Sequence, residues 1–131
     1  AITTLMDVSF IDNALAVKNP DDYEIVPIDV AKAVKSFQLS IYSFEVMNKD
    51  GSLRSDEDLN ERQHELRRAV RAKLEKNEPL PRPMAGIGIN DNFELGAGRD
   101  VFMTLAVDGW SQIPVHIKKS MRKELEKFIA K

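Results

Sequence analysis

The chain contains no cysteine, which excludes disulfide bonds, thiolate metal ligands and cysteine nucleophiles. Histidine is scarce as well, and a zinc site built on His64 or His116 would need further ligands that the sequence does not offer. No apolar run approaches the roughly 20 residues that cross a bilayer, and the N-terminal residues carry no basic leader. These absences predict a soluble, cytoplasmic protein with no metal, no cofactor and no membrane partner.

Complete nucleotide-binding motifs are also lacking. Gly86-Ile87-Gly88 and Gly96-Ala97-Gly98 each contain G-x-G, but the first has Asp91 where a dinucleotide fingerprint needs its third glycine, and no P-loop is present. Glycines of this kind favour a bulge or a tight connection between strands. The loop 86–100 is nevertheless rich in Gly, Asn and Asp, so a small enzyme with its site in this loop stays one hypothesis.

Length and composition are those of an ordinary globular protein. The 131 residues fit one domain spanning 1–131, and 43% hydrophobic with 31% charged residues is enough for a core without long disordered segments. The only candidate boundary is the proline-rich connector 79–83, and the segment after it is too short to form a comfortable core alone. We therefore expect a single domain.

Charge is divided unevenly along the chain. Residues 1–61 carry 12 acidic and 5 basic side chains, whereas residues 62–131 carry 9 acidic and 14 basic ones, although the net charge is only −2. Such asymmetry is typical of a surface that meets an acidic partner or nucleic acid. It can equally mean that the two halves pack against each other or against copies of themselves.

The hydrophobic pattern predicts α+β architecture. Alternation of Met6, Val8 and Phe10 indicates a strand at 4–10 with a short return strand at 15–17, although the spacing of Leu5, Val8, Ile11 and Leu15 also fits a helix. Further strands are predicted at 23–28 (an edge strand, because it contains Pro27), 39–47, 84–89 and 101–107. Turns between strands outnumber helical crossovers, which favours an antiparallel or mixed sheet with about three helices on one face.

Capping signals place these helices. Asp29 is a good N-cap for a helix at 30–37, and Ser55 with Asp58 resembles a capping box that opens a long helix at 56–76. Ser111 can cap a last helix near 114–130, with Pro114 tolerated in its first turn.

Basic side chains gather on the outer faces of the last two predicted helices. The candidate phosphate- or partner-binding residues are Arg67, Arg68, Arg71, Lys119, Arg122 and Lys123. Arginine binds phosphate through its fork of donors and lysine through its point charge. The alternative is a solvated helix face, because Asp58–Arg62, Glu65–Arg68 and Arg71–Glu75 have the spacing of local ion pairs.

The first functional hypothesis is a non-enzymatic binding or regulatory protein that acts through protein–protein contacts, as a homodimer or with another partner. Trp110 is the candidate interface anchor, since aromatic residues dominate interface energetics. The second hypothesis is nucleic-acid binding through the basic helix faces near 56–76 and 114–130. The third is the small enzyme with a site at 86–100.

Overall fold

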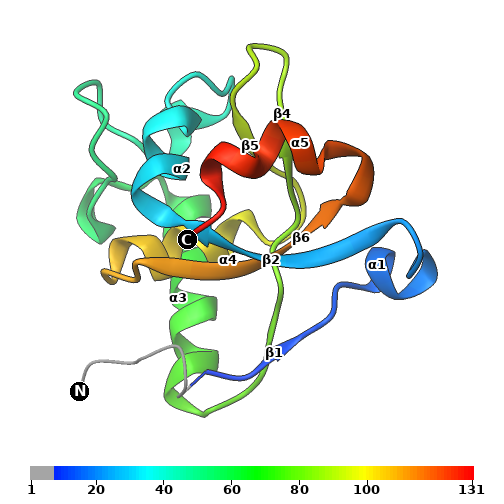
Figure 1. Ribbon diagram of the computed structural model, residues 1–131. Coiled ribbons are helices and arrows are strands. Elements are labelled where there is room, and N and C mark those ends of the chain that lie inside the picture. The colour runs from blue at the N-terminus through cyan, green and yellow to red at the C-terminus, as the bar shows by residue number, and fades with distance from the viewer. Residues whose placement is uncertain (1–7) are drawn as a thin grey trace.

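The computed structural model describes residues 8–131 (Figure 1). In this range α-helices and β-strands are interspersed along the chain, which confirms the predicted α+β class. The helices are α1 (Ala14–Lys18), α2 (Val30–Phe37), α3 (Glu61–Glu75), α4 (Arg99–Val107) and α5 (Arg122–Leu125). The strands are β1 (Phe10–Ile11), β2 (Tyr23–Asp29), β3 (Leu80–Pro81), β4 (Ala85–Ile87), β5 (Phe93–Leu95) and β6 (Gln112–Lys118). Short 3-10 helices are η2 (Ser43–Glu45), η3 (Asp56–Asp58), η4 (Lys119–Met121) and η5 (Glu126–Phe128).

Within the described residues, the strands form three separate two-stranded sheets and not one continuous sheet. β2 and β6 pair antiparallel along their whole length, β4 pairs antiparallel with β5, and β1 pairs parallel with β3. The β2–β6 ribbon crosses the middle of the molecule in Figure 1, with α2 and α5 above it and α3 below it. Leu80 and Pro81 of the predicted connector thus form β3.

Two prolines face each other in the central ribbon without breaking it. Pro27 is the register partner of Pro114. The His116 N–H donates to Pro83 O at 2.9 Å and so points away from β2, which makes His116 and, two residues back, Pro114 members of non-hydrogen-bonded pairs. Neither proline therefore removes a bond from the ladder. The same outward bond, with a bridge from Met84 to His116, joins the chain before β4 to the free edge of β6.

One hydrophobic core joins residues from both sides of the 79–83 segment. Phe93 lies at its centre, with its ring 5.6 Å from that of Phe102 and 5.4 Å from that of Phe128. Ile28 and Ile113 from the ribbon are fully buried beside them. Each such side chain contributes about 1.5–3 kcal/mol through burial.

β2 and α2 form where the sequence predicts them. The Asp29 side chain accepts a hydrogen bond from Lys32 N at 3.1 Å, so it caps the helix at its first turn. Val30, Ala33 and Phe37 face the core from α2. The sequence was sufficient to predict this helix, because the capping residue and the apolar face indicate the same start and the same buried side.

The strand predicted at 39–47 is wrong. The chain leaves α2 through successive i→i+3 bonds, from Leu39 N to Ser36 O, Ser40 N to Phe37 O and Ser43 N to Ser40 O. These bonds occupy the backbone groups that a ladder would need, and η2 follows. The alternation of apolar residues indicated one buried face, whereas Leu39 and Phe44 are exposed.

The strand predicted at 101–107 is also wrong, because this segment is α4. All residues from Val101 to Leu105 are buried. A helix that is covered on every side shows no apolar stripe, so periodicity could not identify it. Within the helix the Thr104 hydroxyl donates to Asp100 O at 2.7 Å, so this buried hydroxyl has a hydrogen-bond partner.

Further differences concern four predicted elements, of which the strand at 84–89 is only shortened, to Ala85–Ile87 in β4. Residues 15–17 belong to α1, and not to a return strand; most of the strand predicted at 4–10 lies outside the described residues. α3 begins at Glu61 with Asn60 as its N-cap, because Asp56–Asp58 forms η3. The last helix predicted near 114–130 is wrong in its first part, where the β-branched, alternating Ile113, Val115 and Ile117 form β6.

Candidate binding surface

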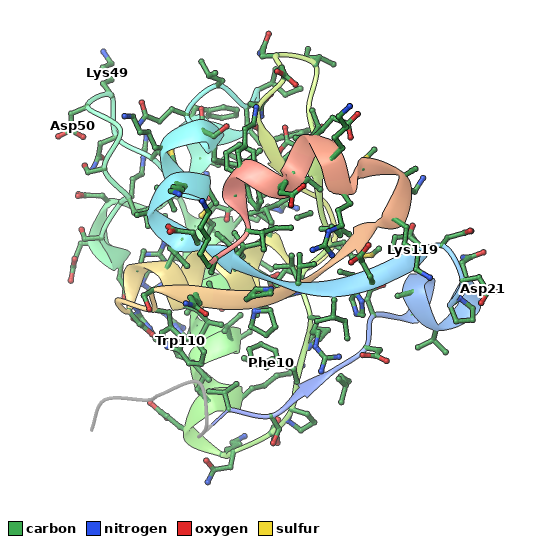
Figure 2. The ribbon with its side chains drawn as sticks, viewed as in Figure 1. Phe10, Asp21, Lys49, Asp50, Trp110 and Lys119 are labelled. Atoms are coloured by element: carbon green, nitrogen blue, oxygen red, sulfur yellow. The ribbon has the colours of Figure 1, made fainter. Side chains whose placement is uncertain are left out.

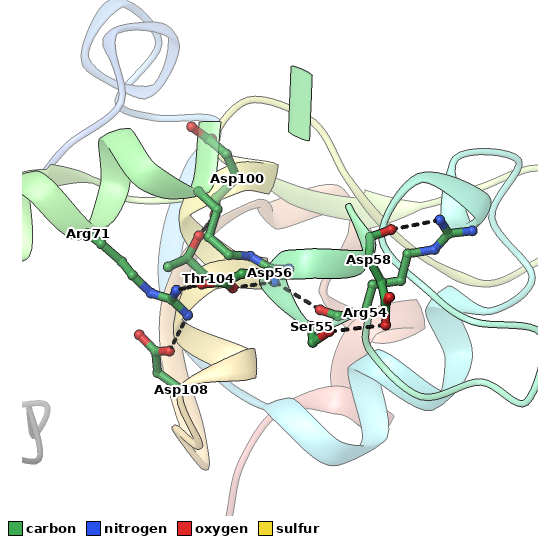
Figure 3. A network of polar contacts seen from close by, with 9 residues as sticks. Arg54, Ser55, Asp56, Asp58, Arg71, Asp100, Thr104 and Asp108 are labelled. Atoms are coloured by element: carbon green, nitrogen blue, oxygen red, sulfur yellow. Dashed lines mark hydrogen bonds and ion pairs between the residues drawn. The ribbon is translucent and has the colours of Figure 1, made fainter. Parts of the chain in front are cut away.

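The predicted basic face of α3 is largely engaged by the chain itself. Arg67 is only 4% exposed, and its Nη1 donates to Arg54 O at 2.9 Å and to Asp56 Oδ1 at 3.1 Å. Arg71 lies between Asp56 and Asp108, with 2.7 Å from Nη2 to the Asp108 carboxylate (Figure 3). The two arginines therefore fasten η3 and the end of α4 to α3.

These contacts shift the ionisation of the participating groups. Burial disfavours the charge on Asp56, but hydrogen bonds and Coulomb attraction from Arg67 and Arg71 outweigh it and lower the pKa of this carboxyl. Burial likewise opposes the charge on Arg71, but Asp108 and Asp56 outweigh it and raise the pKa of the guanidinium. Both groups are charged at neutral pH and compensate each other.

Arg67, Arg68 and Arg71 do surround one hollow of about 240 Å³ on α3. Its walls also include Asp56 and Glu75, and Arg68 pairs with Glu65 at 3.1 Å. The excess positive charge that a phosphate site needs is thereby reduced.

The second group of predicted basic residues lies elsewhere. Lys119, in η4, and Arg122 and Lys123, in α5, are exposed, and Arg122 pairs with Glu24 of β2. Lys119 lies beside the acidic turn at Asp21 in Figure 2, while α3 occupies the opposite lower part of the molecule in Figure 1. The structure thus does not combine the two groups into one surface.

Trp110 is part of the core of its own chain. It is 9% exposed, and Phe10 packs edge-on against it with ring centroids 6.4 Å apart (Figure 2). Little of this side chain is available to a partner in the described conformation. The predicted anchor therefore has an internal packing role.

The Gly/Asp loop 86–100 is organised as the β4–β5 hairpin and the beginning of α4. Asn92 is buried and donates to Phe93 O at 2.8 Å, and the Glu94 carboxylate accepts from the Ser40 hydroxyl at 2.7 Å. Asp91 lies 3.8 Å from Lys127. Among residues 8–131, no three His, Asp or Glu side chains cluster as metal ligands. Nor does any helix in that range have the length and apolarity to cross a membrane.

His116 is the one buried imidazole of the described chain. It is 2% exposed, and its Nε2 accepts a hydrogen bond from Asn13 N at 3.0 Å, so the neutral ring holds the start of α1 on β6. Burial lowers the pKa of His116, Asp12 opposes this and the nearby Arg82 reinforces it. The hydrogen bond from Asn13 fixes the start of α1 against β6. Within residues 8–131, no nucleophilic side chain is hydrogen-bonded to the His116 ring.

A group of large apolar side chains remains exposed around the segment that follows α2 and the tip of the β4–β5 hairpin. We call it the apolar surface, and its members are Leu39 (58% exposed), Ile41 (60%), Tyr42 (42%), Phe44 (66%) and Ile89 (88%). Three of them come from the segment that joins α2 to η2, Phe44 lies in η2 itself, and Ile89 lies at the tip of the β4–β5 hairpin.

Polar contacts hold the two parts of the apolar surface together. Asn90, next to Ile89, donates from its side chain to Leu39 O at 2.9 Å. The Arg99 guanidinium lies over the Tyr42 ring, 4.3 Å from its centroid, and Ser40 is tied to Glu94. The exposed apolar side chains thus sit on a backbone that is fixed at several points.

A hollow of about 340 Å³ adjoins Phe44. We call it the basic groove, and it is lined by Gln38, Ser43, Phe44, Met47, Asn48, Lys49, Gly51 and Arg54. Phe44 and Met47 form an apolar wall, and the two charged lining residues are both cations. Sequence reasoning missed this site because it placed residues 39–47 in a half-buried strand.

Comparisons of the chain with protein-family models, with curated proteins and with solved structures found no match.

Proposed function

We propose that this is a binding protein that recognises another protein through the apolar surface. The observation that carries the proposal is the exposure of five large apolar side chains from two distant segments that are hydrogen-bonded to each other. Large apolar side chains that gather on a surface are costly to expose to water and mark interaction sites. Phe and Tyr among them supply the contact area that dominates interface energies.

Local order supports this interpretation. A loop that is apolar by accident would have no reason to be braced, whereas Leu39 and Tyr42 are each held by a specific polar partner. A braced surface loses little conformational entropy when a partner binds. Self-association through the same surface, as a homodimer, is one form that this function can take.

The test replaces apolar side chains in the surface and in a matched position. The double variant Ile41→Ser with Phe44→Ser removes two exposed members of the apolar surface. Ile25→Thr is the control, because Ile25 lies on β2 and is 49% exposed. We expect the double variant to weaken partner or self-association at least about tenfold, as loss of interface anchors does. Capture from the native source, followed by binding measurements and light scattering, gives the comparison. Equal association of the double variant and the control would refute the proposal.

Nucleic-acid binding is the second candidate, favoured by one observation. Lys118 at the end of β6, Lys119 in η4 and Lys123 in α5 are all exposed within six residues of the chain. Binding through phosphates weakens steeply and log-linearly with salt. A mobility-shift titration of duplex DNA and of RNA at low salt tests it, and no retention of either would eliminate this candidate.

A further inference from the structure

We infer that the basic groove binds an acidic peptide segment that inserts an apolar side chain beside Phe44. This inference rests on the proposed protein-binding function and names the chemistry of the partner. It follows from three properties of the groove: an apolar wall, uncompensated cations and a fixed shape.

The wall of the groove favours an apolar side chain. Phe44 is 66% exposed, and Met47 beside it is almost fully buried, so the hollow is floored and walled by side chains that gain by excluding water. Methionine and phenylalanine also tolerate occupants of several shapes, because the thioether is flexible and soft. A leucine, methionine or aromatic side chain of a partner has the size and polarity for this space.

The charges of the groove favour carboxylates. Arg54 donates from Nε to Met47 O at 3.0 Å and from Nη1 to Asp58 O at 3.2 Å, and both acceptors are neutral backbone carbonyls. Within residues 8–131, neither Arg54 nor Lys49 forms an ion pair with a carboxylate, and no acidic residue lines the groove. The nearby Asp50 carboxylate is turned to Ser52, whose N–H and hydroxyl it accepts at 2.9 and 2.6 Å. The groove thus presents positive charge that a partner can complement.

The turn that carries Lys49 is fixed. Asn48 N donates to Ser52 O at 2.8 Å, and Gly51 N donates to Asn48 O at 3.0 Å. Gly51 has φ of +89°, a backbone conformation that residues with a side chain rarely adopt, so glycine suits this position of the turn. Lys49 projects from the tip of this turn (Figure 2).

These properties select a peptide over the other anionic partners. A phosphate backbone would meet the cations but leave the Phe44 and Met47 wall exposed to water. A lipid surface is flat and would cover the apolar surface without entering a hollow. An extended acidic segment with one apolar side chain engages both features at once.

The experiment selects ligands from a random peptide library displayed on phage, with the full chain as bait. We expect enriched peptides to combine an excess of Asp and Glu with a large apolar residue. Their synthetic versions should bind Lys49→Glu about tenfold more weakly, since reversal turns an attraction into a repulsion. Lys73→Glu, an exposed cation on α3, is the matched control and should bind as the unaltered chain does.

Arg54→Gln is the second variant, and circular dichroism verifies that it folds, because Arg54 also holds Met47 O and Asp58 O. Lys49→Glu removes no hydrogen bond between described residues, so it keeps the test independent of folding. Enriched peptides without acidic excess, or peptides that bind Lys49→Glu and Lys73→Glu equally, would overturn the inference.

The outcomes also separate this inference from the proposed function. Neutral peptides that lose binding to Leu39→Ser with Ile41→Ser, two members of the apolar surface that do not line the groove, would leave the apolar surface as a binding site while removing the acidic partner. Peptides that bind every one of these variants as tightly as they bind the unaltered chain would refute both the proposed function and the acidic partner. Sedimentation with phosphatidylserine vesicles that depends on Lys49, without any peptide enrichment, would replace the peptide by a lipid surface.

Discussion

Arginines that are adjacent in the sequence have different environments and different structural roles in this chain. Arg67 and Arg68 are neighbours on α3, yet the first is buried against Asp56 and the carbonyl of Arg54, while the second is exposed and pairs with Glu65. A buried guanidinium whose partners are fixed is an internal fastening. An exposed one in high dielectric contributes little to stability.

Arg67→Ala should therefore unfold at lower urea concentration, with a loss of about 3 kcal/mol in the free energy of unfolding, because Arg54 O and Asp56 lose a buried partner. Arg68→Ala should change it by less than about 0.5 kcal/mol. Urea titrations followed by circular dichroism give both values. A small effect at Arg67 would mean that the residue is free for a ligand, as its place in the sequence suggests.

At the scale of elements, the sequence predicts those parts in which local signals agree. The sequence predicts α2 from its N-cap to its last residue, because the Asp29 cap and the apolar face that ends at Phe37 both indicate the same helix. α4 could not be identified, because burial on all sides removes the period from Val101 to Leu105. The apolar surface was missed for the converse reason. Residues 39–44 have the composition of a half-buried strand, but Leu39, Ile41, Tyr42 and Phe44 are exposed.

The start of α4 depends on a glycine that the sequence does not distinguish from others. Gly98 has φ of +82°, and a Cβ there would lie 2.8 Å from Pro83 Cα, whereas Gly109 has φ of +93° and open space around it. Gly109→Ala should cost about 1–2 kcal/mol from backbone strain alone. Gly98→Ala should cost about 1–3 kcal/mol more, because Pro83 must move. Thermal and urea unfolding of both variants measure the difference, and equal losses would contradict the contact with Pro83.

At the scale of the molecule, the charge asymmetry between the two halves of the chain is partly compensated by ion pairs between them. Ion pairs that join an acid of residues 8–61 to a base of residues 62–131 are Arg62–Glu45, Arg67–Asp56, Arg71–Asp56, Arg82–Asp12 and Arg122–Glu24. The halves thus pack against each other with opposite charges in contact. The accessible positive charge of the basic groove is local, and the overall count of residues does not reveal it.

Asp56 is the acid on which two of these pairs converge, so it should couple the stability of the whole molecule to acid. Its pKa is lower in the folded chain than the ordinary 3.8, so its contribution is fully present above pH 3.8 and is lost as pH falls through the folded value. Asp56→Asn should lose about 1 kcal/mol at pH 7, a modest figure because the carboxylate is partly solvated. Its stability should also fall less steeply than that of the unaltered chain below pH 4.

The neighbouring Glu57→Gln is the matched control for this measurement, because Glu57 is exposed and pairs with no base in the described range. Urea titrations at pH 7, 4 and 3 compare the three proteins. Glu57→Gln should follow the unaltered chain at each pH, since Glu57 forms no ion pair among the described residues whose loss could be measured. Identical acid profiles for Asp56→Asn and Glu57→Gln would show that Arg67 and Arg71 do not hold the acidic half to the basic half through this carboxylate, and the internal neutralisation of charge would lose its main support.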